Sequence, residues 1–532
     1  QKKYTLSCWV KRANLGSDQT IFSAGNSGSG NPGFEQLNFT SGNALRYYRQ
    51  IGGVGNTEYV TTQLFRDTSA WYNIVVMMDA ANTIGYIYVN GVRVTSFSTT
   101  NHPTNVDGAV NSTQKHAFGN RSIDGSSDFD GYLAEVNFLD GLIVGETSGY
   151  LDQFGELKNG VWIPKAYSGS YGTNGYRLDF ADNAVDAPTS EGTEDTDNIG
   201  SDSSGEHNNF TSSGIVASDC AMPDSPENNF CTYNPLYLWT RTNTTISEGN
   251  LRSVETGTTF GVKGLGTIAL NSGKWYFETY VTNSGVTTSG SVGIVDLNSL
   301  KTITGYGSDT DLHISICYTG TGKKSAYGTG VDSNITSDGQ GQTAYGSTFT
   351  NGDIIGVAID FDNDAIWFSK NGTWQGSATL SEISAGTTTN AAYTGKLAAF
   401  NSWTVSNGNG LNAVNFGFHL NCGQDSTFSG LEDAGSNTDA NGIGNFIYEL
   451  PTSYLAICTA NLLEPTIGPN SSTQSTDHFG VLKYTGNGAQ TRTITSGASG
   501  IGGQADFKPD WVVQRIVTNT GQSAGNWDST RG

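Results

Sequence analysis

The residues of this chain that could bind a ligand are aromatic side chains standing beside amides and charged groups. In the stretch AFNSWTVSNGNG, Trp403 lies between Asn401 and Asn407, on a segment that we expect to be a loop. Sugar recognition uses the flat face of an aromatic ring together with polar groups that bond to hydroxyls. Trp403 is therefore the first candidate for a ligand-binding residue. The alternative at this position is a structural residue on the surface of a β-sandwich.

Two further places in the chain have the same combination of groups. Tyr47 and Tyr48 stand between Arg46 and Arg49, and Tyr306 lies in the stretch ITGYGSD. An exposed tyrosine offers both an apolar ring and a hydroxyl, so each of these three residues could line a binding site. A structural role is again the alternative at each position.

Two acidic patterns have spacings at which a metal ion could bind. Asp128 and Asp130 lie in a Gly/Ser-rich turn and could supply oxygen ligands to calcium, although paired acids in such a turn can also be simply solvated. Asp360, Asp362 and Asp364 have the spacing of calcium-loop ligands, but the glycine and the distal glutamate of an EF-hand loop are missing. A hairpin turn whose acids face water is the preferred interpretation of the second pattern.

Catalytic patterns are poorly supported by the sequence. A retaining glycosidase needs two carboxyl groups about 5 Å apart on either side of one bond, and no Glu-x-Asp-x-x-Glu strand is present. Glu191 and Glu194 are close in sequence but lie in an acidic, turn-rich stretch. The six histidines include no HExxH pattern, and the stretch TGTGKKS lacks the first glycine of a P-loop. We predict that the chain is not an enzyme.

Length and charge restrict the classes of function. The chain has 532 residues, enough for two to four domains, and its 70 glycines with 14% charged residues suit many turns between short strands. The net charge is −22 without a cluster of Lys and Arg, which argues against a nucleic-acid partner. No apolar run approaches the roughly 18 residues needed to cross a bilayer, so no membrane insertion is predicted.

The six cysteines are spread along the chain and form no CxxC pair. Their spacing selects no pairing. Cys220 and Cys231 could close a small loop, whereas small buried hydrophobic residues are the expected state of the others.

Two similar hairpins indicate the architecture that positions these groups. Residues 353–374, DIIGVAIDFDNDAIWFSKNGTW, alternate apolar and polar residues on two strands around a polar turn, and residues 75–91, VVMMDAANTIGYIYVNG, repeat the design. Counted from Asp360 and Asp79, the shared positions are a turn asparagine, an aromatic residue and an Asn-Gly pair: Asn363 and Asn82, Trp367 and Tyr86, Asn371-Gly372 and Asn90-Gly91. We predict an all-β chain that contains two related β-sandwiches.

Residues 1–145 resemble a known class of sandwich. The stretches YTLSCWVKR, WYNIVVMMD, IGYIYVNGVRV and FDGYLAEVNFLDG occur in this order, and together they resemble the laminin-G-like, concanavalin A-like jelly-roll domains. The resemblance implies binding of a carbohydrate or a protein, often beside a calcium ion.

Residues 229–428 resemble a second class. The stretches GKWYFETYV and SVGIVD, the hairpin at 353–374 and AVNFGF have the order and spacing of SPRY domains. The resemblance implies a non-catalytic module that binds a partner through loops at one edge of the sandwich. After Gly417 the chain reads FHLNCGQDSTF, which departs from the usual end of such domains in phage proteins.

The remaining segments are expected to be a connector and a partial domain. Residues 146–228 contain the stretch GVWIPKAYSGSYGTNGYRLDFAD and an acidic run, and we interpret them as an extended connector. With DSPENNFCTYNPL they resemble a connector in large structural proteins of tailed marine bacteriophages. Residues 429–532 resemble the start of a further β-domain of the same proteins, and we expect that domain to continue past residue 532.

These resemblances imply a tail fibre or tail-associated adhesin of a phage virion that acts outside the cell. The predicted partners are a host-surface glycan or protein and other tail proteins, and the usual symmetry of such fibres implies a homotrimer. No cofactor is required, although calcium could bind. Two alternatives stay open: a purely structural spacer or decoration protein of the virion, and a polysaccharide depolymerase whose carboxylates meet between chains.

Overall fold

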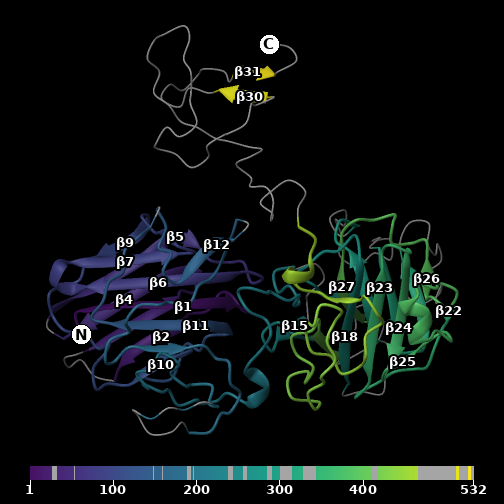
Figure 1. The fold of residues 1–532 in the computed structure, drawn as a ribbon, viewed down its shortest axis with the longest axis horizontal. Coiled ribbons are helices and arrows are strands. Elements are labelled where there is room, and N and C mark those ends of the chain that lie inside the picture. Colours follow the sequence, from purple (N-terminus) through teal and green to yellow (C-terminus); the bar gives the residue numbers. More distant parts are fainter. Residues whose placement is uncertain are drawn as a thin grey trace. The chain divides into compact units, whose positions relative to one another are not determined.

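The regular structure of the chain is almost entirely β-strand in the computed structural model (Figure 1). By its contacts the chain divides into two compact units. The first unit is Gln1–Gly155 with Pro164–Leu462, and the second is Glu156–Ile163 with Leu463–Gly532. The structure describes residues 1–26, 33–52, 54–147, 149–158, 160–187, 193, 195, 197–237, 244–255, 261–283, 290–299, 314–327, 343–409, 416–464, 511–514 and 525–528. Within these ranges no helix is long and apolar enough to cross a membrane.

Two six-stranded antiparallel sheets form the first sandwich. In spatial order, the first sheet is β14 (Tyr176–Leu178), β11 (Gly131–Asp140), β1 (Lys3–Arg12), β6 (Trp71–Asp79), β7 (Ile84–Val89) and β8 (Val92–Arg93). The second sheet is β10 (His116–Phe118), β2 (Gln19–Gly25), β3 (Phe34–Phe39), β4 (Ala44–Ile51), β5 (Val54–Leu64) and β9 (Phe97–Asn101). Alternate residues of facing strands, such as Leu6, Leu37 and Val76, fill one buried core.

The second sandwich also packs two sheets on each other. The larger sheet is β15 (Thr244–Ser247), β16 (Arg252–Glu255), β28 (Phe416–Asn421), β18 (Lys274–Asn283), β23 (Ile354–Asp360), β24 (Ala365–Lys370) and β25 (Thr373–Trp374), with β26 (Tyr393–Thr394) on β24 and β29 (Leu455–Ala456) on β18. The other sheet is β17 (Gly261–Leu265), β27 (Trp403–Asn409), β19 (Gly290–Asp296), β20 (Ser315–Thr319), β21 (Lys323–Tyr327) and β22 (Thr343–Ala344).

Helices are short in the described part of the chain. The helical turns are η1 (Ala80–Asn82), η2 (Ala217–Asp219), α1 (Leu380–Ser384) and η4 (Thr459–Asn461). Two small hairpins are formed by β12 (Gly155–Lys158) with β13 (Val161–Pro164) and by β30 (Trp511–Gln514) with β31 (Gly525–Asp528). The second unit contains the β30–β31 hairpin and all of the β12–β13 hairpin except Gly155 and Pro164. The all-β class predicted from the sequence is confirmed.

The two predicted hairpins occur as β6–β7 in the first sandwich and β23–β24 in the second, and their turns are built alike. The Asp79 carboxylate accepts hydrogen bonds from the backbone N–H (3.3 Å) and side-chain amide (2.8 Å) of Asn82. The Asp360 carboxylate accepts the same two bonds from Asn363, at 3.0 and 2.8 Å. The shared spacing in the sequence is therefore the spacing of one turn-closing interaction.

The Asn-Gly pairs close the far ends of the same hairpins. Asn90 and Asn371 have φ angles of 48° and 47°, a left-handed conformation that asparagine tolerates. The side-chain oxygen of Asn90 accepts a hydrogen bond from the backbone N–H of Asn73 on β6, at 2.8 Å. The side-chain oxygen of Asn371 accepts one from the backbone N–H of Ile354 on β23, also at 2.8 Å. The asparagine therefore both permits the turn and attaches it to its own sheet.

Much of the expected connector packs on the first sandwich instead of extending into water. β14 joins the first sheet, and Leu151, Phe154 and Tyr171 pack against Val75 and Met77 on its outer face. That face is apolar, and covering it removes apolar area from water. The prediction of an extended connector is wrong for this part, because its aromatic residues are covered within the chain.

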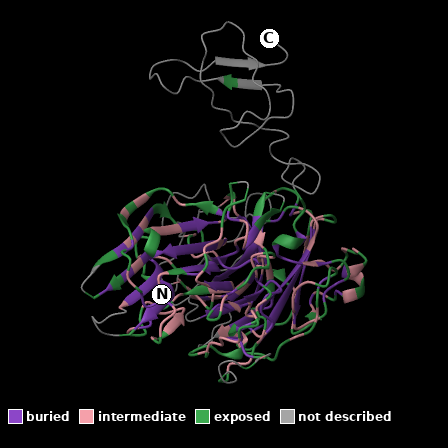
Figure 2. Cartoon of the chain, turned by 60° about the vertical axis from the view of Figure 1, so that its left-hand side comes forward, coloured by how far each residue is buried: buried purple, intermediate pink, exposed green. Residues whose placement is uncertain are grey.

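The second sandwich extends past its predicted end at residue 428. Residues 429–462 lie over the outer face of the larger sheet, where Phe446 and Tyr454 pack with Tyr276 and Trp367. Trp367 is fully buried as a result. Buried residues occur along the strands of both sandwiches (Figure 2). Residues 465–510 of the predicted further domain lie outside the described residues.

Candidate functional site

Trp403 lies in the core and not on a loop. It is the first residue of β27, its side chain is 1% exposed, and its indole N–H donates to the carbonyl of Leu397 at 3.0 Å. β27 runs between β17 and β19, so alternate residues of the strand point into the sandwich. The predicted exposure of this ring is wrong, and the ring has no free face for a sugar.

The residues predicted to act with Trp403 do not gather around a shared cleft. Asn407 is 2% exposed, and its side-chain oxygen accepts the backbone N–H of Gly264 at 2.8 Å, beside a bulge in β17. Asn401 is exposed, and its side-chain oxygen accepts from the amide of Asn298 at 3.3 Å. Tyr306 lies outside the described residues.

The two adjacent tyrosines of β4 point to opposite faces of their sheet. Tyr47 is in the core, where its hydroxyl donates to the Glu35 carboxylate and meets the hydroxyl of Tyr4 at 2.8 Å. Burial is the main cause that raises the pKa of Tyr47. Tyr48, the next residue, is half-buried on the outer face, as the period of two along a strand requires.

Tyr48 belongs to a group of polar side chains that we call the polar face: Gln36, Asn38, Arg46, Tyr48 and Glu58. The register of β3, β4 and β5 places Gln36, Tyr48 and Glu58 in one cross-strand row and Asn38 and Arg46 in the next. These five residues come from three strands. The sequence pattern had indicated Arg46 and Tyr48, whereas the amides and the carboxylate could be added only once the register was known.

The polar face is held together by charge and stacking. The Arg46 guanidinium donates to the Glu58 carboxylate at 2.7 Å and lies 4.3 Å from the centre of the Tyr48 ring. The side chains of Arg46 and Glu58 are 28% and 23% exposed, so both can meet solvent or a ligand. The stack and the ion pair each restrict the rotamers of these side chains before any ligand arrives.

Two members of the polar face, Gln36 and Asn38, are buried amides. Gln36 donates to the Thr20 hydroxyl at 2.6 Å, and Asn38 donates to the carbonyl of Phe39 at 3.2 Å. The side-chain oxygen of Asn38 is buried and has no hydrogen-bond partner among the described residues. A buried oxygen of this kind is costly unless some donor reaches it.

The acidic patterns do not form a metal cage in the described part of the chain. No group of three or more His, Cys, Asp or Glu side chains gathers there in a manner that could hold an ion. Asp128 and Asp130 are both exposed, and calcium at this turn stays a prediction. The second pattern does form a hairpin turn, but of its three acids only Asp362 is exposed. Asp360 is 0% exposed, and the half-buried Asp364 accepts the backbone N–H groups of Lys396 and Leu397, so the prediction that these acids face water is wrong for Asp360.

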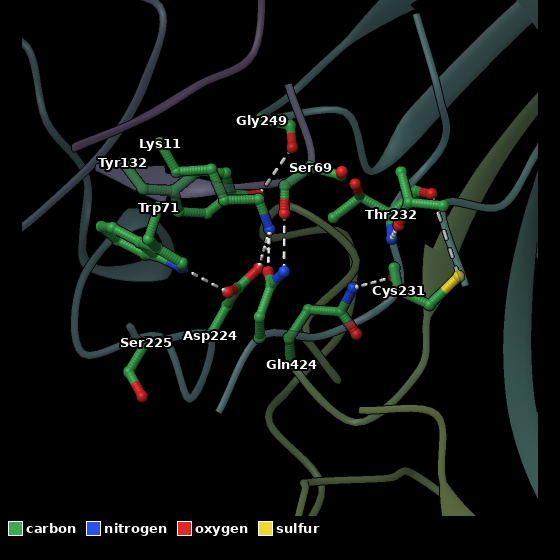
Figure 3. Close-up of polar contacts among 12 residues, drawn as sticks. Lys11, Ser69, Trp71, Tyr132, Asp224, Ser225, Cys231, Thr232, Gly249 and Gln424 are labelled. Carbon is green, nitrogen blue, oxygen red and sulfur yellow. Dashed lines mark hydrogen bonds and ion pairs between the residues drawn. The ribbon is translucent and has the colours of Figure 1, made fainter. Parts of the chain in front are cut away.

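A buried polar junction links the first sandwich to Asp224, Asn229 and Gly249 (Figure 3). The Lys11 ammonium donates to the Asp224 carboxylate at 2.7 Å and to the side-chain oxygen of Asn229 at 2.6 Å. The Trp71 indole donates to the other oxygen of Asp224 at 3.2 Å, and the ammonium lies 5.3 Å from the centre of the Tyr132 ring. The side chains of Lys11 and Asp224 are 1% and 0% exposed.

This junction joins elements that are distant in the sequence. Lys11, Trp71 and Tyr132 come from β1, β6 and β11, whereas Gly249, which accepts a bond from the Tyr132 hydroxyl at 2.7 Å, precedes β16. The amide of Asn229 also donates to the carbonyl of Ser69 at 2.6 Å. Buried charges are tolerated when they are paired and hydrogen-bonded, so these groups are suited to fastening segments together.

The comparisons with known proteins identify two domain types. Residues 1–145 match the model of the concanavalin A-like lectin/glucanases superfamily, and residues 274–394 match the model of the SPRY domain. No curated protein matches the chain. Both domain types are generally ligand-binding β-sandwich modules without catalytic activity. The chain therefore contains two β-sandwich domains of types that generally bind ligands.

Solved structures similar to parts of this chain include SPRY domains and a pentraxin. The SPRY domain of human HERC1 has 16% identity over 36% of this chain and 97% of that chain, with a TM-score of 0.24. A human SPRY domain has 17% identity and a TM-score of 0.21, and the match covers 34% of this chain and 94% of that chain. The heptameric SAP-like pentraxin from Limulus polyphemus has 14% identity and a TM-score of 0.21, and the match covers 27% of this chain and 66% of that chain.

Proposed function

We propose that this chain is a non-catalytic binding protein of a tailed-phage virion and that the polar face of its first sandwich recognises a host-surface glycan. One observation carries the site: an aromatic ring, a guanidinium and a carboxylate lie together on the outer face of a rigid sheet. The placement in a tail appendage rests on the resemblance of the connecting segments to phage structural proteins.

The chemistry of the polar face suits a sugar. Hydroxyl groups of a pyranose can donate to the Glu58 carboxylate and accept from the Arg46 guanidinium, while the C–H face of the ring can lie on an aromatic side chain such as Tyr48. Because the three groups are already held by one another, little side-chain freedom is lost when a sugar binds. Single sites of this type bind weakly, and several copies in a trimeric fibre would gain by avidity.

A structural spacer is a second candidate, and the buried junction favours it. Lys11 and Asp224 fasten the first sandwich to the segment that leads into the second, as a protein that holds virion parts apart requires. The two candidates differ in one respect, because a spacer has no need of a receptor.

The test is binding of the labelled full chain to intact cells of candidate hosts, with and without a calcium chelator. We expect saturable binding that falls about tenfold in Tyr48→Ala, since a stacking contact is worth roughly 1–2 kcal/mol. Tyr86→Ala is the matched control, because Arg93 stacks on Tyr86 at 3.6 Å on the other sheet of the same sandwich. Loss of binding on chelation would show that binding requires calcium, and Asp128 and Asp130 would then be the first residues to replace.

Treatment of the cells separates the two classes of receptor. Periodate oxidises sugar diols and should abolish binding, whereas protease should leave it intact. Binding that resists periodate and disappears with protease would overturn the glycan and indicate a protein receptor. If a folded multimer binds no susceptible host, or if Tyr48→Ala binds as the parent chain does, the polar face is not the receptor site and the spacer is the better account.

A further inference from the structure

Cys231 and Cys422, which are 191 positions apart in the sequence, lie together in the core of the second sandwich. Both side chains are 0% exposed. The side chain of Gln424 joins their backbones, because it accepts the N–H of Cys422 at 2.7 Å and donates to the carbonyl of Cys231 at 2.8 Å (Figure 3 shows the latter contact). The two backbones are thus held within the span of one amide side chain.

The packing around the pair is close. A Cβ atom placed on Gly423 would lie 2.9 Å from the ring of Phe230, and one on Gly266 would lie 2.8 Å from the sulfur of Cys231. The side chain of Cys231 lies beside that of Cys422, and this proximity lowers the pKa of Cys231, while burial raises the pKa of Cys422. All six cysteines are free thiols in this structure.

We propose that Cys231 and Cys422 form a disulfide when the chain folds in the presence of an oxidising disulfide such as oxidised glutathione. The Cys231 thiolate would attack glutathione disulfide, forming a mixed disulfide and releasing one glutathione thiolate. The Cys422 thiol, after losing its proton, would attack the Cys231 sulfur and release the second glutathione. One sulfur–sulfur bond forms and one breaks, and the two cysteine protons leave with the two reduced glutathiones.

The cross-link would secure the segment that carries the junction. Cys231 follows Asp224 and Asn229, which bind Lys11 of the first sandwich, and its own N–H donates to the carbonyl of Ile457 at 2.9 Å. A disulfide to Cys422, directly after β28, would attach this segment covalently to the second sandwich. A cross-link over roughly 190 residues also restricts the unfolded chain strongly.

The other cysteines are less suited to pair with Cys231. Cys8 lies in the core of the first sandwich, and Cys317 lies on β20. The small loop that the sequence allowed between Cys220 and Cys231 is not favoured, because the sulfur of Cys220 contacts the carbonyl of Val216 instead. Cys458 is buried near the pair and is the competing partner for Cys422.

The test is disulfide mapping of the full chain folded with oxidised glutathione, compared with chain folded in dithiothreitol. Free thiols are alkylated in denaturant, and the unreduced peptides are identified by mass spectrometry. We expect one cross-linked peptide that joins Cys231 to Cys422, and alkylated Cys8 and Cys317. Oxidation should raise the urea midpoint of the parent chain and of Cys317→Ala, but not that of Cys422→Ala.

The outcomes that overturn the proposal are equally specific. Alkylation of both Cys231 and Cys422 after oxidation would exclude the cross-link. A peptide that joins Cys422 to Cys458 would show that Cys422 pairs with Cys458 and not with Cys231. If Cys422→Ala fails to fold, the peptide map of the parent chain decides the matter without any substitution. The proposal does not depend on receptor binding, so each can fail alone.

Discussion

At the scale of single residues, Glu278 shows how burial alters an ordinary side chain. It lies on β18 and is fully buried, and its carboxylate accepts the backbone N–H groups of Ile447 and Tyr448 at 3.0 and 2.9 Å. Burial is the largest influence and raises the pKa of Glu278 to about 7, although these hydrogen bonds act in the opposite direction.

This shift predicts a fall in stability with rising pH. The folded chain binds a proton at Glu278 up to about pH 7, whereas the unfolded chain releases it near its ordinary value of 4.5. The stabilisation is therefore complete below about pH 4.5 and is lost as pH rises to 7, with a total of about 3 kcal/mol. Urea unfolding of the parent chain and of Glu278→Gln at several pH values should show this loss in the parent alone.

A second buried group makes the comparison with the variant necessary. Burial lowers the pKa of His419 to about 4, so its contribution to stability rises with pH between about 4 and 6.5 and partly hides the effect of Glu278. His419 is unchanged in Glu278→Gln, and subtraction of the two pH profiles removes its contribution. Parallel profiles for the parent and the variant would contradict the assignment to Glu278.

At the scale of elements, the outer face of the larger sheet in the second sandwich depends on a segment that carries little regular structure. Residues 429–462 bring Phe446, Leu450 and Tyr454 onto Tyr276 and Trp367. The sheet is thus covered on both faces, which explains why β23 and β24 consist almost wholly of buried residues.

A chain ending at residue 428 should therefore fail to fold its second sandwich, whereas one ending at residue 462 should fold. Loss of several large apolar contacts, each worth about 1.5–3 kcal/mol, is comparable with the 5–15 kcal/mol that holds a typical domain. Solubility and thermal unfolding of the two fragments provide the measurement. A soluble, cooperatively unfolding chain that ends at 428 would show that the covering segment is dispensable.

At the scale of the whole first unit, the buried junction should contribute strongly to stability. Lys11→Met keeps the length of the side chain but leaves Asp224 without its cation, and removal of one partner of a buried pair costs about 3–5 kcal/mol. Arg121→Ala is the control, because the ion pair of Arg121 with Asp124 is exposed and screened by solvent, so its loss should change stability little.

Urea unfolding of both variants measures this difference, and limited proteolysis near residue 224 reports whether the segment has come loose. The additional change Asp224→Leu in the Lys11→Met chain should restore part of the loss, since it removes the unpaired charge. Equal costs for Lys11→Met and Arg121→Ala would mean that the junction does not hold the segment.

The sequence by itself determined the all-β class, the two sandwiches and both hairpins. These features follow from local signals: alternation with period two, the acidic turns that begin at Asp79 and Asp360, and the Asn-Gly pairs. Such signals act between residues a few positions apart, so they can be recognised without knowledge of what the strands pack against.

The tertiary structure alone decided which side chains face water. Trp403 has a ligand-like setting in the sequence, yet β27 lies between two other strands and its ring is in the core. Tyr48 could be separated from Tyr47, and joined with Glu58, only through the register of β3, β4 and β5. Lys11 and Asp224 are 213 residues apart. The residues that cover each face of a strand come from segments distant in the sequence, and no local pattern in the chain shows which segments pack together.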